Sequence, residues 1–185
     1  MLRKLLLWLL TLTAVLAWAQ PVDQRPLVAE RDVRVERSGN AFIVDLVMHT
    51  PVEPALAWAV LTDFEHMGSI VPNLTSSEVI KRRDGVLTVK QKGVVRYGLF
   101  STAFESTREI SLLPQREIRA HGVGGNVQRM ESLMQLEAEG AGTRLKYHAE
   151  VQPGFWFPPV IGPALVRRDT AEQFSALLRE MIRRQ

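Results

Sequence analysis

The side chains in this sequence that could do chemistry are scattered rather than gathered into a known catalytic spacing. The histidines show neither an HxH nor an HExxH pattern, and there is no GxSxG nucleophile elbow. The GVGGN stretch at 122–126 follows no strand–helix unit, so it reads as a turn and not as a dinucleotide loop. We therefore predict no catalytic residue, no metal site and no cofactor. The four histidines are His49, His66, His121 and His148.

One cation falls where a charge is costly. At 100° per residue, the C-terminal helix predicted below carries an apolar stripe with Arg167 at its centre. A buried guanidinium needs a partner. Arg167 is therefore expected to meet a carboxylate, an anionic or carbonyl group of a ligand, or water reached through a cavity, and an internal salt bridge or a snorkelling side chain remains the alternative. The stripe consists of Ala164, Ala171, Phe174, Leu178 and Met181.

The stretch GFWFPPVIGPALVRR, residues 154–168, runs aromatic residues into two prolines. Trp156, Phe157 and Ile161 lie between the last predicted strand and the C-terminal helix, at one mouth of the expected cavity. Either these side chains cap an end of the core, or they line the entrance and contact a bilayer while ligand is exchanged. Further candidates for ligand contact, each with ordinary core packing as the alternative, are Tyr97, Phe104, Met130, Met134, Tyr147 and Phe174.

An enzymatic interpretation has few groups to draw on. Arg129 and Glu131 share a parity on one predicted strand, so they could form an internal pair or, if they face a cavity, an acid–base pair. Together with Arg167 they are the only candidates that the sequence offers.

The elements that must position these residues follow from the periodicity. Alternating apolar residues predict strands near 33–36 and at 41–49, and helical spacing then predicts two short helices within 51–72. Further strands are predicted at about 76–83, 86–96, 100–112, 116–123, 127–138 and 143–152, where turn residues separate them. In the third of these, Phe100, Phe104, Ile110 and Leu112 share one parity. A helix from Pro163 to Arg184 ends the chain.

Short connections between consecutive strands indicate an antiparallel sheet with one buried face. Only the last helix is long enough to cover that face. The predicted fold class is α+β, a helix-grip fold in which a curved antiparallel sheet wraps around a long C-terminal helix, with two short helices after the first strands. An elongated space is expected between sheet and helix.

Composition places the chain among exported globular proteins. Of its 185 residues, 46% are hydrophobic and 23% are charged, and none is cysteine. Residues 1–19 have the charged start, apolar run and Ala-Trp-Ala end of a secretory signal peptide, which leaves 20–185 as one domain and predicts a periplasmic location. Loss of Arg3 and Lys4 lowers the formal charge from +3 to +1, too little for a nucleic-acid partner.

Three stretches resemble the START-like (SRPBCC, helix-grip) superfamily, in particular its polyketide cyclase/dehydrase and coenzyme Q-binding branch. They are PVEPALAWAVLTDFEHMGSIVPNL (51–74), GTRLKYHAEV (142–151) and VRRDTAEQFSALLREM (166–181). The resemblance implies a hydrophobic ligand held between sheet and C-terminal helix. Activities vary within this superfamily, so fold alone does not settle function.

The sequence thus predicts an exported, monomeric protein that binds or transports a lipid or another hydrophobic small molecule, with transient membrane contact and no nucleic-acid partner. Two alternatives stay open. One is a cyclase- or hydrolase-type enzyme that uses the same cavity. The other is a non-catalytic interaction domain with a filled interior.

Overall fold

The computed structural model describes residues 26–97, 100–154 and 162–185, apart from the side chains of Tyr97 and Phe100. The predicted signal peptide and the aromatic segment with Trp156, Phe157 and Ile161 lie outside the described residues. Within the described ranges, no helix is both long and apolar enough to cross a membrane.

The elements follow one another as two strands, two short helices, six strands and one long helix, after a short 3₁₀ turn. They are η1 (Glu30–Asp32), β1 (Arg34–Ser38), β2 (Ala41–Thr50), α1 (Pro54–Leu61), α2 (Met67–Ile70), β3 (Leu74–Arg83), β4 (Val86–Tyr97), β5 (Phe100–Leu113), β6 (Glu117–Gly125), β7 (Val127–Glu139), β8 (Gly142–Pro153) and α3 (Gly162–Arg183).

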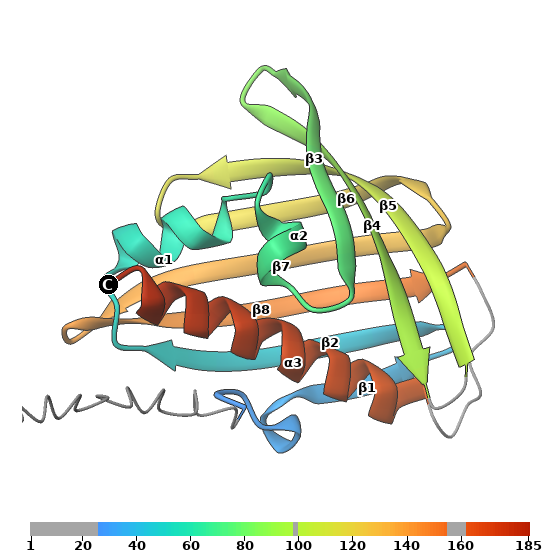
Figure 1. Ribbon diagram of the computed structural model, residues 1–185, viewed down its shortest axis with the longest axis horizontal. Coiled ribbons are helices and arrows are strands. Elements are labelled where there is room, and N and C mark those ends of the chain that lie inside the picture. Colours follow the sequence, from blue (N-terminus) through green and yellow to red (C-terminus); the bar gives the residue numbers. More distant parts are fainter. Residues whose placement is uncertain (1–25, 98–99, 155–161) are drawn as a thin grey trace, which may run out of the picture.

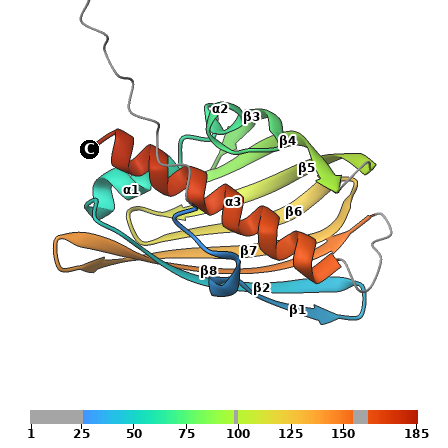
Figure 2. The same cartoon turned by 60° about the horizontal axis from the view of Figure 1, so that its bottom comes forward.

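All eight strands form one sheet in the order β1-β2-β8-β7-β6-β5-β4-β3. Strands β3 to β8 form an antiparallel meander, and β8 pairs with β2. An early strand and the last strand of the chain therefore lie side by side in the sheet. The sheet is curved, and α3 crosses its concave side (Figure 1). The view from below shows the same helix lying against the strands (Figure 2). The predicted α+β helix-grip fold is confirmed.

The buried face arises from strict alternation along the strands. In β2, Phe42, Val44 and Leu46 are only 2–3% exposed, whereas the residues between them point to the other side. Successive side chains of a strand face opposite sides of a sheet, so alternation of this kind buries one face and leaves the other in water. The concave face is therefore the apolar one.

The terminal helix closes the concave side. Its buried stripe includes Ala171, Phe174, Leu178 and Met181, as the helical spacing predicts, whereas Ala164 of the predicted stripe is exposed. Near its C-terminal end α3 packs against α1, whose Ala57 and Val60 have no exposed surface. This end of the interior is filled by side chains.

Candidate ligand-binding cavity

A cavity of about 350 Å³ lies between α3 and the concave face of the sheet. Strands β4 to β8 form its floor together with part of β2, residues 165–177 of α3 form its roof, and residues between α1 and β3 close one side. Its apolar wall includes Val44, Phe64, Met67, Phe104, Ile118, Met130, Met134, Val151, Leu165 and Phe174. The volume falls within the range of about 300–1,000 Å³ that is usual for small-molecule sites.

Gly93 on β4 allows one of these wall residues to reach the cavity. A Cβ atom at this position would collide with the backbone oxygen of Asn73 and with the ring of Phe104 on the neighbouring strand. Glycine is the residue that permits such a close approach. The Phe104 ring therefore lies over the backbone of β4 and forms part of the cavity wall.

Arg108 on β5 carries a cation into this apolar space. An Nη atom donates a hydrogen bond to the side-chain oxygen of Gln91, and Gln91 in turn donates to the Ser77 hydroxyl over 3.0 Å. The Nε atom of Arg108 is buried and has no hydrogen-bond partner. No carboxylate forms a salt bridge with Arg108 in the part of the chain that the structure describes. Burial lowers the pKa of Arg108 because it disfavours the charged form.

Tyr147 on β8 is the second ionisable group of the floor. Its ring lies 4.8 Å from that of Phe174 on α3, centroid to centroid. Burial raises the pKa of the Tyr147 hydroxyl, while the charge of Arg108 and a hydrogen bond with Ser132 act against this rise. The phenol is thus neutral over the physiological range and available as a hydrogen-bonding group.

Asp169 on α3 is the only carboxylate of the cavity wall in the described residues. Burial raises the pKa of Asp169, whereas a hydrogen bond from Arg168 lowers it less strongly. Arg168 also donates to the backbone oxygen of Arg96 over 2.9 Å, so it joins α3 to the end of β4. The cavity therefore holds a cation without a carboxylate partner on its floor and, on the opposite wall, a carboxyl group that pairs with Arg168 and whose pKa is raised by burial.

Five of the residues that the sequence singled out line this cavity: Phe104, Met130, Met134, Tyr147 and Phe174. Arg167 does not. Its Nε donates to the backbone oxygen of Val33 over 3.2 Å, which gives this half-buried guanidinium a partner outside the cavity. The side chain of Tyr97, together with Trp156, Phe157 and Ile161, lies outside the described residues.

The acid–base candidates of the sequence are not part of the cavity. Arg129 and Glu131 do not pair with each other. Arg129 lies 3.9 Å from Glu150 and Glu131 lies 2.5 Å from the ring of His121, on the wet face of the sheet. Each of the four histidines likewise has its Nδ1 within 2.5–2.7 Å of a carboxylate oxygen. In the described ranges, no group of three acidic or histidine side chains could hold a metal ion.

Sequence reasoning missed Arg108, although the signal was present. Ser106 and Arg108 have the same parity on β5 as Phe104 and Ile110, and all four lie on the cavity side. An arginine within an apolar row at strand spacing is a buried charge in need of a partner. Arg167 on the helix is likewise a cation within an apolar stripe, but there the backbone carbonyl of Val33 supplies the partner.

The fold and the cavity define a START-like domain, and the comparisons with known proteins agree. The family described as "Polyketide cyclase / dehydrase and lipid transport" matches residues 50–177, more than half of the chain. The chain belongs to this family. The comparison with curated proteins found no match.

Several solved structures share the fold at low identity. The Zhui aromatase/cyclase from a Streptomyces species is 19% identical with a TM-score of 0.66, over 78% of this chain and 95% of its own. A START superfamily protein from Mycobacterium smegmatis is 11% identical with a TM-score of 0.67, over 77% and 99%. A STAR-related lipid transfer protein from Xanthomonas axonopodis is 13% identical with a TM-score of 0.61, over 83% and 99%.

Proposed function

We propose that this protein is an exported, monomeric carrier that holds one lipid or similar hydrophobic molecule, with an anionic end of that molecule bound by Arg108. The supporting observation is the Arg108 side chain, which lines an apolar cavity without a carboxylate partner and whose buried Nε makes no hydrogen bond. A buried charge of this kind is costly unless it is paired. A ligand carboxylate, phosphate or sulfonate would supply both the missing charge and the missing hydrogen bond.

The apolar wall would supply most of the affinity. At about 25 cal/mol per Å² of apolar area, a tail that buries roughly 200 Å² gains about 5 kcal/mol. A hydrogen bond to a charged group adds about 1.5–3 kcal/mol and fixes which end of the ligand lies at Arg108. The head-group role that the sequence suggested for Arg167 is therefore assigned to Arg108.

Native mass spectrometry of the protein purified from its own compartment tests the carrier function directly. A hydrophobic acidic compound that leaves the protein on organic extraction is the expected result. Titration with oleate and with anilinonaphthalene sulfonate then tests the residue: Arg108→Leu should weaken binding of both by about tenfold to a hundredfold. The exposed Arg129→Leu makes the same change of charge outside the cavity and should bind as the wild type does.

Two results would contradict the proposal. One is a protein that is always recovered empty and that binds neither probe. The other is equal binding by the Arg108 and Arg129 variants. Loss of binding in Arg167→Leu, with Arg108→Leu unaffected, would return the head-group role to the helix.

Export rests on the sequence pattern of residues 1–19 and is tested separately. Fractionation of cells that express the full chain should recover a shortened protein from the periplasm. A chain that lacks residues 1–19 should stay in the cytoplasm. Sedimentation of the processed protein tests the monomeric state, and flotation with vesicles tests membrane contact.

A second candidate function is a cyclase-type enzyme, because Tyr147 and Asp169 meet Arg108 in one cavity and the pKa values of both acids are raised. A raised pKa favours the protonated form that a general acid needs, and a cation beside it could stabilise a developing enolate. The discriminating variant is Asp169→Asn. It should keep ligand binding in a carrier, whereas in an enzyme it should abolish turnover of a polyketide-like substrate without loss of binding.

A further inference from the structure

The wall of the cavity includes one segment that is built differently from the rest. Residues 62–73, called the cover segment below, connect α1 to β3 and include the short helix α2. Phe64, Met67 and Val71 of this segment line the cavity and are 6–8% exposed. Glu65 and Ser69 lie on its outer side and are exposed. The cover segment is thus a single layer of chain between the cavity and water.

The backbone of the cover segment is held mainly by itself. In the middle of the segment, backbone hydrogen bonds run to neighbours within it, such as His66 N to Asp63 O and Val71 N to Met67 O. Backbone bonds to other elements lie at the two ends of the segment. Thr62 N and Asp63 N donate to Trp58 O and Val60 O of α1, and at the other end Val71 O accepts from Leu74 N and Asn73 O from Val94 N. The floor strands, in contrast, are tied to their neighbours along whole ladders. Opening the middle of the cover segment therefore breaks fewer backbone bonds to neighbouring elements than parting two floor strands would.

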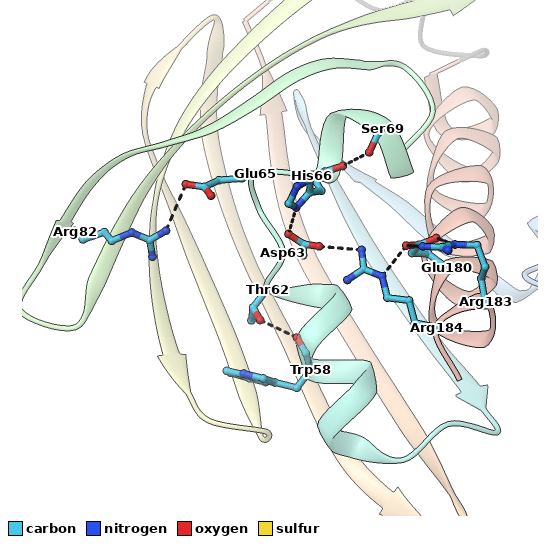
Figure 3. A network of polar contacts seen from close by, with 10 residues as sticks. All are labelled: Trp58, Thr62, Asp63, Glu65, His66, Ser69, Arg82, Glu180, Arg183 and Arg184. Atoms are coloured by element: carbon cyan, nitrogen blue, oxygen red, sulfur yellow. Dashed lines mark hydrogen bonds and ion pairs between the residues drawn. The ribbon is translucent and has the colours of Figure 1, made fainter.

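Side chains therefore hold the cover segment in place, and its least exposed ion pair to another element is with the end of α3. Arg184 donates from Nη2 to Asp63 Oδ2 over 2.8 Å and from Nε to Glu180 Oε1 over 2.6 Å (Figure 3). The three side chains, called the clasp below, are only 14–28% exposed. A second contact, Arg82 to Glu65 at 3.6 Å, joins the segment to β3 but is about 60% exposed on both sides.

The clasp is charged under ordinary conditions. Burial acts to raise the pKa of Asp63, but hydrogen bonds from His66 and Arg184 outweigh it and leave the pKa lowered. Hydrogen bonds from Arg183 lower the pKa of Glu180 to about 2, against a smaller effect of burial and with further help from Arg184. Partly buried and connected pairs of this kind hold better than isolated exposed ones.

From these observations we propose that the cover segment is the door of the cavity, and that the clasp of Asp63, Arg184 and Glu180 sets how often it opens for ligand exchange. The inference rests on the proposed carrier function and adds to it the route of exchange. Opening would swing Phe64, Met67 and Val71 away from the cavity. It would not disturb Arg108, which lies on the floor.

Displacement kinetics with a named probe test the clasp. Anilinonaphthalene sulfonate is bound first, and its release is followed by fluorescence after excess oleate is added. Arg184→Gln should release the dye about fivefold faster, because an ion pair near the surface contributes up to this factor. The dissociation constant should change little, since a door accelerates entry and exit alike. Arg183→Gln is the control: Arg183 contacts the same Glu180 but is 70% exposed and does not touch Asp63.

Hydrogen–deuterium exchange on the ligand-free protein separates failure of the clasp from failure of the carrier proposal. In Arg184→Gln, amides of residues 64–71 should exchange faster, while those of α1 stay as in the wild type. If neither probe binds but this local change is seen, the carrier proposal fails and the clasp stands. Identical exchange in the Arg184 and Arg183 variants overturns the clasp whether or not ligand binds.

Because the chain has no cysteine of its own, a cross-link gives a second test. Cysteines placed by Asp63→Cys and Arg184→Cys and joined by a short bis-maleimide should slow dye release well below the wild-type rate. The same double variant without the cross-linker should release the dye faster than the wild type. Release that is unaffected by the cross-link would show that ligand leaves elsewhere.

Discussion

The two ends of α3 cover the same sheet, but one end lies over a packed core and the other over a cavity. At the C-terminal end Met181 is fully buried and the helix packs against α1, whose Val60 is also fully buried. In the first half of the helix, Leu165, Asp169 and Thr170 face a cavity of about 350 Å³ instead. One continuous helix therefore has a filled end and a hollow end.

The difference lies in which residues the sheet presents to the helix. Below the hollow end the floor carries small or polar side chains where a packed core would carry large ones: Ser106, Ala120, Ser132 and Ala149. Interiors normally reach the density of organic crystals. Open space beside a cation that has no carboxylate partner supports the proposed ligand site at the hollow end.

The largest effect is expected at the filled end. Met181→Ala should destabilise the fold by about 2–5 kcal/mol, because it removes a fully buried side chain from a packed region. Thermal unfolding should show a fall in Tm of about 5–15 °C. Ile182→Ala is the matched control, since Ile182 is the next residue and is 42% exposed. Equal effects of the two variants would mean that this end is not packed as described.

At the hollow end, replacing a charged side chain by an apolar one should stabilise the fold instead of destabilising it. Arg108→Leu should stabilise the ligand-free protein by about 1–2 kcal/mol, since it removes a charge that is buried without a carboxylate partner. The same variant should lose affinity for oleate, so that stability and binding move in opposite directions. Arg129→Leu should change neither by a comparable amount. A lower Tm for Arg108→Leu would show that the guanidinium serves the fold, not a ligand.

A smaller effect on stability is expected when the cavity is filled in part. Ala120→Leu adds bulk beside the cavity, where room exists, so the free energy of unfolding should change by less than about 1.5 kcal/mol. Binding of oleate should fall because the added side chain occupies the space of the ligand tail. The same change at a packed site, Ala57→Leu in α1, should destabilise the protein by about 1–3 kcal/mol. If both variants are equally destabilised, the hollow end is not hollow in solution.

Most of the fold followed from the sequence because its signals are local. The alternation of Phe42, Val44 and Leu46 and the stripe around Phe174 each fix which face of an element is buried. Short turns then leave few ways to connect the strands. The resemblance of residues 51–74 to a known superfamily pointed to the same architecture.

The site followed less completely, because its charges depend on contacts that are distant in sequence. Arg167 was singled out from its place on the helix, but its partner is the backbone oxygen of Val33, 134 residues away. Arg108 shares the parity of the apolar residues on its strand, so the sequence places it on the buried face. The pattern of one strand does not reveal whether a carboxylate from another element lies beside it. The packing of several elements together decides which arginine retains an N–H group without a hydrogen-bond acceptor.

The smallest expected effects are on the pH dependence of stability, which should have opposite signs at the two ends of α3. Burial raises the pKa of Asp169 at the hollow end. Its contribution to stability is therefore present below the ordinary pKa and lost as pH rises through the raised value. Glu180 at the filled end has its pKa lowered to about 2, so its contribution is present above the ordinary pKa and lost as pH falls through about 2.

Thermal unfolding between acid and neutral pH tests both signs. Relative to the wild type, Asp169→Asn should gain stability as pH rises from acid to neutral, because the variant no longer ionises a buried group. Glu180→Gln should be less stable than the wild type at neutral pH, and this deficit should shrink in strong acid. Each difference should amount to about 2 °C in Tm. If both variants shift in the same direction with pH, the hollow end does not favour a protonated carboxyl group, and the contrast between the two ends of α3 would rest on packing alone.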